Sequence, residues 1–400
     1  MVQKKKEEVE SNVIIQIIES LFNRAIRQNA SDIHIEPEKD ILRVRFRIDG
    51  ILREIETHQI SLLESLVSRL KVLAEMDIAE HRLPQDGRIQ LKIGDKELDI
   101  RVSTFPTFYG ENVALRLLDK STILMGLEHL GFDQESLLKY EGMIKRPYGI
   151  IFVTGPNGSG KTTTLYSTLN KLNSVEKNIV TLEDPIEYEL PMIRQTQIDP
   201  EIGLTFASGL RSLLRQDPDI LMVGEIRDTE TGEIAIRSAL TGHLVLTTLH
   251  TNDSVGALAR LSDMGVESVL ISSATIGVIA QRLIRTVCTF CAEDYEAPKQ
   301  LLEKIGLGAK EKTVFKKAVG CEKCGSTGFL GRMGIFEVLV MDDELRSLIV
   351  SGASYETIAT VARKKGMKTL RDDGIAKALK GLTTIEEVFR VTSSEQSFGL

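Results

Sequence analysis

Gly155-Pro156-Asn157-Gly158-Ser159-Gly160-Lys161-Thr162 decides the fold of this chain, because it satisfies the phosphate-binding pattern G-x-x-x-x-G-K-[ST] at every fixed position. The glycines let the backbone curl so that successive N–H groups point into one concavity, which suits a triphosphate. In this pattern Lys161 reaches the β- and γ-phosphates, and the Thr162 hydroxyl holds Mg²⁺. The sequence therefore predicts that the whole loop binds ATP.

The segments on either side of the loop fit a strand–loop–helix unit. Residues 150–153 are typical of a buried strand, and residues 163–172 of a helix whose N-terminal dipole points at the phosphates. Thr163, at the start of that helix, is assigned to the same site. Strands and helices alternate from about Gly149, which indicates a parallel sheet. The candidate strands are 150–153, 178–182, 220–223 and 244–249. We therefore predict an α/β fold with a RecA-like P-loop ATPase domain at 136–287.

Composition narrows the class of protein. The chain has 400 residues, of which 42% are apolar, and its net charge is 50 − 57 = −7. This acidic balance argues against a protein whose main partner is duplex DNA, so no direct nucleic-acid partner is expected. The charged start does not look like a secretory signal, and no run of 18 apolar residues occurs. We expect a cytoplasmic protein that does not span a membrane.

The first third of the chain has a different pattern. An amphipathic helix is expected at 12–29, and apolar residues alternate with arginines from Ile41 to Ile48, as in a strand with one basic face. A second helix is expected at 62–76, followed by further strands. Residues 1–120 are therefore predicted to form a small α+β domain, and 121–135 a linker.

Two acidic segments follow candidate strands of the phosphate-loop domain. Glu225 comes after the strand 220–223, one residue later than the usual Walker aspartate, and Glu183 and Glu187 come after the strand 178–182. ATP hydrolysis needs a Mg²⁺ ligand and a group that orients the attacking water. We assign Glu225 to Mg²⁺ and its waters, and leave Glu183 and Glu187 as rivals for the water. The alternative is that these are solvated surface acids.

Histidines flank the candidate strand 244–249. His243 precedes it and His250 follows it, in a chain with six histidines. A histidine at a strand end is often a hydrogen-bonded structural residue, but one beside a triphosphate can sense its charge. Both interpretations stay open, and His250 is included among the candidate catalytic residues.

Four cysteines form two C-x-x-C pairs, Cys288 with Cys291 and Cys321 with Cys324. Four thiolates satisfy tetrahedral Zn²⁺ and leave no open ligand position, so a structural zinc site is predicted at 288–330. Two unrelated reduced pairs are the alternative. A redox role is less favoured, because neither pair lies in a thioredoxin-like βαβ pattern. The remaining segment, 331–400, is expected to be helical.

Taken together, these motifs resemble the secretion ATPases that drive type II secretion and type IV pilus assembly, over nearly the whole chain. Residues 181–187 resemble the Asp box of that family, 224–228 its atypical Walker B motif and 241–252 its His box. Residues 1–120 resemble its PAS-like domain. In the family, the two cysteine pairs distinguish assembly and export ATPases from retraction ATPases.

The resemblance implies roles that the residues alone do not show. It assigns Arg101 and Arg116 to the nucleotide's phosphates. It implies a Mg²⁺-dependent ATPase motor that forms a homo-hexameric ring and acts on a platform protein, at the inner face of the bacterial inner membrane. Relatives usually carry a further N-terminal domain, so a truncated or short member is expected. A pilus-retraction ATPase, a nucleic-acid translocating ATPase and a non-hydrolysing scaffold are the alternatives.

Overall fold

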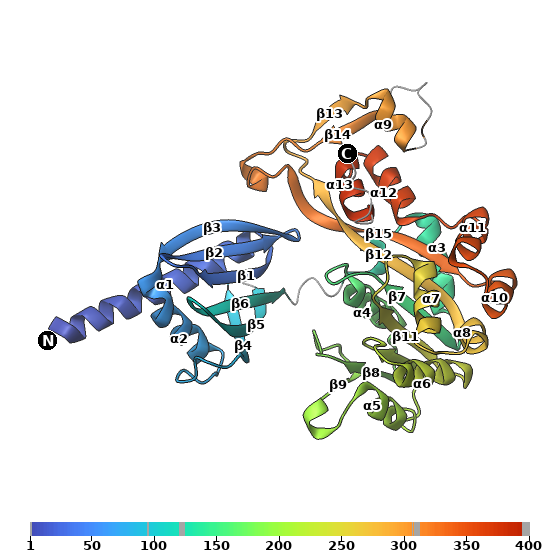
Figure 1. Ribbon diagram of the computed structural model, residues 1–400, viewed down its shortest axis with the longest axis horizontal. Coiled ribbons are helices and arrows are strands. Elements are labelled where there is room, and N and C mark those ends of the chain that lie inside the picture. The colour runs from blue at the N-terminus through green and yellow to red at the C-terminus, as the bar shows by residue number, and fades with distance from the viewer. Residues whose placement is uncertain (1, 94–95, 120–124, 306, 308–312, 394–400) are drawn as a thin grey trace. The chain divides into compact units, whose positions relative to one another are not determined.

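The computed structural model describes residues 2–93, 96–119, 125–305, 307 and 313–393 (Figure 1). The chain divides into two compact units, Met1–Ile123 and Leu124–Leu400. Of the predicted linker 121–135, residues 121–124 lie outside the described residues. The remainder belongs to the second unit, where Leu127 and Leu130 are buried.

Unit 1 is an antiparallel sheet with two helices (Figure 1). The helices are α1 (Val2–Arg27) and α2 (Leu63–Leu73). The strand order is β3-β2-β1-β6-β5-β4. The strands are β1 (Ala30–Pro37), β2 (Ile41–Ile48), β3 (Ile51–Gln59), β4 (Gln85–Ile93), β5 (Lys96–Thr107) and β6 (Gly110–Asp119).

Alternating side chains explain how this sheet buries one face. In β2, Leu42, Val44 and Phe46 are fully buried, and the arginines between them lie on the other face. There Arg45 pairs with Glu36 of β1 at 2.6 Å. The apolar stripe of α1, including Ile18 and Leu21, packs into the same core. The period-two pattern therefore sets the buried face, as predicted.

Unit 2 is built on a sheet, here called the main sheet, in the order β15-β12-β7-β11-β10-β8-β9. The strands from β12 to β9 run parallel, and β15 is antiparallel to β12. They are β7 (Gly149–Thr154), β8 (Ile179–Glu183), β9 (Arg194–Gln197), β10 (Ile220–Val223), β11 (Leu244–Leu249), β12 (Thr275–Val287) and β15 (Phe329–Val340). This parallel sheet confirms the predicted α/β class.

Helices accompany the main sheet and form the C-terminal part (Figure 1). They are α3 (Gln134–Ile144), α4 (Lys161–Leu172), α5 (Phe206–Leu213), α6 (Thr229–Leu240), α7 (Ser254–Asp263), α8 (Ser268–Ala274), α10 (Asp343–Val350), α11 (Tyr355–Lys364), α12 (Leu370–Leu379) and α13 (Ile385–Thr392). Every residue of β7, β8, β10 and β11 is buried. Burial on both faces explains why these strands are continuous apolar runs.

The last strand pair of the main sheet lies where no strand is predicted from the sequence. β12 and β15 pair over most of their length, and most of β15 lies in the segment 331–400 that is predicted to be helical, whose helices begin at Asp343. Glu387 of α13 ties this region to β12, because its carboxylate accepts from the Arg285 guanidinium at 2.8 Å. Burial would raise the pKa of Glu387, but hydrogen bonds from Arg390 and Arg285 outweigh it and lower the pKa to about 2.

Between the cysteine pairs, a small hairpin of β13 (Glu293–Glu296) and β14 (Val314–Lys317) carries α9 (Lys299–Lys304). Its core includes Leu302 and Phe315, which pack with Ile385 and Val388 of α13. The cysteine segment is therefore continuous with the C-terminal helices.

Candidate functional site

The phosphate-binding loop lies at the carboxyl end of β7 and leads directly into α4. Gly160 occupies the position before the helix, with a left-handed φ of 89°. Gly155 is buried, and a Cβ there would lie 2.5 Å from the Gln281 carbonyl oxygen and 2.5 Å from Ser159 Oγ. The loop therefore needs a glycine at 155 because another strand's backbone passes so close.

Lys161 is buried at the start of α4, and its ammonium lies inside the loop. Its Nζ donates to the carbonyl oxygens of Gly155 at 2.8 Å and Pro156 at 3.1 Å. Burial lowers the pKa of Lys161 to about 8, against an opposing effect of the Glu225 charge and with a further lowering by Arg282. A buried ammonium is stabilised by anions, so the loop favours a phosphate ligand.

The other loop residues divide into buried and exposed groups. Ser159 is buried, and within the described part of the chain its Oγ has no hydrogen-bond partner. Pro156, Asn157, Gly158, Thr162 and Thr163 are exposed. A free, buried hydroxyl and an exposed Thr162 hydroxyl fit a loop that hydrogen-bonds a bound nucleotide.

Glu225 follows β10 at the same carboxyl edge of the main sheet and is contacted by a guanidinium and an imidazole. Arg227 approaches its Oε1 at 2.5 Å, and His250 Nε2 lies 3.3 Å from its Oε2. Burial raises its pKa, but the hydrogen bond and charge of Arg227, with those of His250, hold the pKa of Glu225 below its usual value. A carboxylate kept ionised in this way is suited to a Mg²⁺ ion.

The two predicted strand-end histidines lie at opposite edges of the main sheet. His250 follows β11, beside Glu225. His243 precedes β11, and its Nδ1 lies 2.9 Å from the Ser238 carbonyl oxygen. Because these strands are parallel, only His250 is at the edge that carries the phosphate loop, and His243 fits the structural interpretation.

Glu183 and Glu187 differ in their surroundings. Glu183 is the last residue of β8, is 3% exposed, and accepts hydrogen bonds from Thr181 and Gln195. Glu187 lies four residues later in the loop and is half-buried. Glu183 is therefore the more deeply buried of the two rivals for the attacking water.

Sequence reasoning missed the contribution of β12. Gln281 is 2% exposed, and its side-chain oxygen accepts from Thr164 of α4 at 2.7 Å. Arg282 donates to the Asn252 carbonyl oxygen at 2.9 Å, and burial lowers its pKa. Two polar residues, Gln281-Arg282, inside a long apolar run were the signal that could have identified them.

Arg101 and Arg116 belong to unit 1 and face each other on β5 and β6. Arg116 is 62% exposed, and its Nε lies 3.2 Å from Asp32 Oδ1 of β1. Arg101 is half-buried and stands opposite Arg88 of β4. The sheet thus brings the two predicted arginines together on one face.

The four cysteines converge, and their sulfur atoms all lie within 4.8 Å of one another. Cys288 Sγ and Cys321 Sγ are 3.8 Å apart, and Cys291 Sγ and Cys324 Sγ are 3.9 Å apart. Four Zn–S bonds of about 2.3 Å in a tetrahedron separate the sulfurs by about 3.8 Å. The spacing therefore fits a tetrathiolate metal site and is too long for disulfides.

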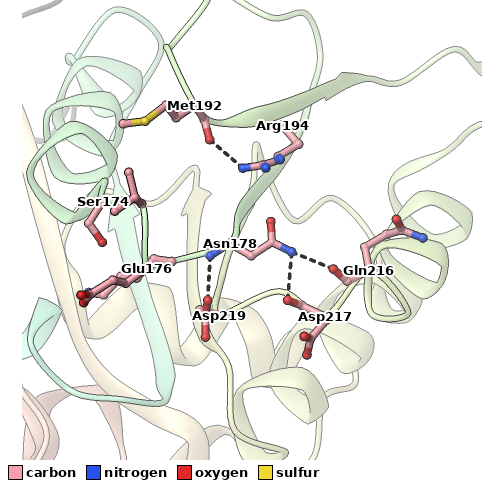
Figure 2. Close-up of a pocket in the computed structure, with 10 residues that line it drawn as sticks. Ser174, Glu176, Asn178, Met192, Arg194, Gln216, Asp217 and Asp219 are labelled. Carbon is pink, nitrogen blue, oxygen red and sulfur yellow. Dashed lines mark hydrogen bonds between the residues drawn. The ribbon is translucent and has the colours of Figure 1, made fainter.

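A pocket of about 650 Å³ lies elsewhere, at the amino ends of β8 and β10 (Figure 2). Asn178 N–H donates to Asp219 Oδ2 at 2.7 Å, and its side-chain amide donates to the Gln216 and Asp217 carbonyl oxygens. Asn178 therefore uses its polar groups within the pocket wall, and the pocket lies at the edge opposite the phosphate loop. We therefore do not assign the nucleotide to it.

A family described as type II/IV secretion system protein matches residues 7–390. The chain belongs to this family. It is 53% identical over 382 residues to type II secretion system protein E of Dickeya dadantii (strain 3937), covering 96% of this chain and 76% of that protein. It is 51% identical to type II secretion system ATPase E of Vibrio cholerae serotype O1, covering 95% and 75%. The predicted resemblance to secretion ATPases is confirmed.

Comparisons with a pilus assembly ATPase and with two solved structures support this family assignment. The type IV pilus assembly ATPase PilB of Thermus thermophilus is 48% identical, covering 96% of this chain and 44% of that protein. The structure of the Legionella pneumophila ATPase DotB has a TM-score of 0.69 at 22% identity, covering 94% of this chain and 95% of that one, and so shares the fold. The pilus retraction motor PilT with bound ADP gives 0.62 at 25% identity, covering 94% and 97%. In the described ranges, none of the helices combines the length and the hydrophobicity that a membrane-spanning helix needs.

Proposed function

We propose that this secretion ATPase hydrolyses ATP at the carboxyl edge of the main sheet, and that hydrolysis drives type II secretion or type IV pilus assembly. The observation that carries the proposal is the complete phosphate loop with Lys161 buried inside it, beside the ionised Glu225. Membership of the family supports the mechanical role, since relatives are named for secretion and for pilus assembly.

In this proposal, different residues bind the phosphates and the Mg²⁺ ion. Loop N–H groups and the Lys161 ammonium hold the phosphates, with the ammonium exchanging its loop carbonyls for phosphate oxygens. Thr162 and Glu225 would hold Mg²⁺. When bound together with ATP, this ion would neutralise negative charge on the phosphates. Arg227 and His250 keep Glu225 ionised, so that its acceptor oxygens stay available.

The cysteine site holds Zn²⁺ in a structural role. All four ligands are protein thiolates, so no position remains for substrate. Backbone N–H groups of Cys321 and Gly328 donate to Cys324 Sγ at 3.2 Å each, which stabilises a thiolate. The four cysteines favour an assembly or export motor over a retraction motor.

The assembly proposed for this chain is a homo-hexameric ring on a platform protein at the inner face of the inner membrane. Family membership supports it. Sedimentation of the purified chain with and without ATP tests the ring, and a monomer under both conditions at micromolar concentration contradicts it.

Substitution of Lys161 by alanine tests the site. We expect ATP hydrolysis to fall at least about a hundredfold, as when other groups that stabilise transition-state charge are removed. Lys171→Ala is the matched control, because it removes the same charge from the same helix at a surface pair with Glu141. Its turnover should stay within about twofold of wild type. Full activity of the Lys161 variant would falsify the site assignment.

A further inference from the structure

Residues 250–254, here called the 250–254 segment, join β11 to α7, and each of the last four forms a hydrogen bond to another element of the fold. Thr251 N–H donates to the hydroxyl oxygen of Thr154, the last residue of β7, at 2.9 Å. The Asn252 carbonyl oxygen accepts from the Arg282 guanidinium of β12 at 2.9 Å. The middle of the segment is therefore tied to the strand that leads into the phosphate loop and to the strand beside it.

The end of the 250–254 segment is held by the C-terminal part of the chain. Asp253 caps α7, since its carboxylate accepts from the Gly256 N–H at 2.7 Å, and its other oxygen accepts from the Tyr355 hydroxyl of α11 at 3.0 Å. Ser254 donates from its N–H, at 2.8 Å, and from its hydroxyl to a single oxygen of Glu337 in β15. Strand β15 and helix α11 therefore fix the point at which α7 begins.

Glu337 is a buried acid that supplies an acceptor to the start of α7. Its side chain is 4% exposed, and Ser254 is fully buried. Burial raises the pKa of Glu337, and its hydrogen bonds from Ser254 oppose this only in part. A buried carboxylate destabilises a fold unless its acceptor oxygens are used. Here the two buried donors of Ser254 share one of these oxygens, and both would lose it if residue 337 were apolar.

The other end of the 250–254 segment is His250, which lies at the proposed ATP site. Its Nε2 is 3.3 Å from an oxygen of Glu225, the carboxylate assigned to Mg²⁺. The segment is short and has no regular secondary structure before α7, so its path is set by its hydrogen bonds together. Releasing Ser254 therefore alters the path of the chain back to His250.

We propose that Glu337 and Tyr355 are positioning residues of the ATP site. They fix the 250–254 segment so that His250 stays against Glu225. The inference rests on the proposed ATPase function, and it adds a role for the C-terminal part of the chain, from which both residues come. Glu337 acts as an acceptor and not as a charge, because the two groups that donate to it are neutral.

Two substitutions at residue 337 test the role of its acceptor. Glu337→Met and Glu337→Gln both put a neutral side chain of similar size in place of the carboxylate, but only glutamine keeps an oxygen. We expect Glu337→Met to lower kcat about tenfold or more and to raise the Mg²⁺ concentration at half-maximal turnover, because small displacements at an active site are costly in rate. Glu337→Gln should keep both values within about twofold of wild type. Equal kcat values for the two variants overturn the proposal.

A change in stability alone gives a different result. A less stable variant has fewer active molecules, so its apparent kcat falls while its Mg²⁺ requirement does not change. Amide hydrogen exchange supplies a readout that does not depend on activity. Without nucleotide, residues 250–256 should exchange faster in Glu337→Met and not in Glu337→Gln. If kcat falls in Glu337→Met while either the Mg²⁺ requirement or the exchange is unchanged, the proposal is overturned.

Tyr355→Phe tests the second contact, and it decides the question if Glu337→Met fails to fold. Tyr355 is 39% exposed, so loss of its hydroxyl leaves the core intact. We expect kcat to fall about threefold or more, the effect of losing one ordinary hydrogen bond. Tyr295→Phe is the matched control, since its hydroxyl also donates to a C-terminal acid, Glu386, at 3.3 Å but does not contact the segment. Equal kcat values for the two tyrosine variants contradict the proposal.

A double variant tests whether Glu337 acts through His250. In a His250→Ala background, Glu337→Met should lower kcat no further. Multiplicative losses would mean that Glu337 acts elsewhere, and they overturn the proposal.

The two levels of the hypothesis fail differently. A wild-type chain without Lys161-dependent hydrolysis overturns the proposed function and this inference together. A wild-type chain that hydrolyses ATP, with Glu337→Met folded and at full kcat, overturns this inference alone.

Discussion

At the residue scale, the phosphate loop depends on a close approach that only glycine allows. The space beside Gly155 is filled by the carbonyl oxygen of Gln281 from β12 and by the buried Ser159 hydroxyl. Gly158 and Gly160 also have positive φ angles, of 73° and 89°. At 160 the nearest atom is the end of the flexible Gln281 side chain, which can move. The backbone contact at 155 cannot be relieved so easily.

Gly155→Ala should therefore weaken nucleotide binding. A methyl group 2.5 Å from a backbone oxygen must displace either the loop or β12, and the loop is the less supported of the two. We expect the affinity for a fluorescent ATP analogue to fall at least tenfold in an equilibrium titration. Gly142→Ala, in the exposed face of α3 with no atom near its Cβ, is the control and should leave affinity unchanged. Equal affinities for the two variants would contradict the argument.

At the element scale, the sequence predicted the strands that carry the phosphate loop and the acidic loops, and it missed the strands beside them. β7, β8, β10 and β11 are short buried runs bounded by turn residues, which is the pattern of a parallel strand. β12 is also buried, but it follows α8 without a turn signal, so its apolar run resembles one long helix-like segment. Periodicity cannot separate these two cases.

The missed strand explains the missed site residues. Gln281 and Arg282 reach the phosphate loop only because β12 pairs with β7, and that pairing is a property of the tertiary fold. Local motifs such as residues 155–162 carry their function in their own spacing and were predictable. The hydrogen bonds of Tyr166 with Glu183 and Glu187 join segments 17 and 21 residues apart, and no spacing rule indicates them.

The cysteine element gives a prediction of its own. Its hairpin core is small, so zinc should supply much of its stability. Cys288→Ser should lower the zinc content of the purified chain from about one per chain to near zero. Local protection of residues 288–324 from hydrogen exchange should fall, while Lys161-dependent nucleotide binding persists. Thr327→Ser is the control, because Thr327 is not one of the four cysteine ligands, and it should leave the zinc content unchanged. Unchanged zinc in the Cys288 variant would reject the tetrathiolate site.

At the scale of the whole molecule, the chain consists of a nucleotide-binding unit and a first unit with an unusual row of charges. Register pairs run from Arg88 to Arg101, from Arg101 to Arg116, and from Arg116 to Asp32 across neighbouring strands. Like charges directly opposite each other destabilise a sheet. Asp32 offsets part of this cost by pairing with Arg116, and Asp99 by pairing with Arg88. Because this row of arginines destabilises the sheet, it does not serve the stability of the fold. Binding of an anionic ligand explains its presence better.

The role that the resemblance assigns to Arg101 and Arg116 stays a prediction, and this row makes it testable. Arg116→Ala should lower kcat/KM for ATP at least tenfold, because a cation that stabilises the phosphates is lost. Its melting temperature should change little, since the exposed ion pair with Asp32 contributes little and the repulsion from Arg101 disappears with it. Arg69→Ala, on the exposed surface of α2, removes the same charge from the same unit and should leave turnover unchanged. If the Arg116 and Arg69 variants hydrolyse ATP equally well, the first unit does not supply this cation, and the cost of the charge row must be explained by another anion.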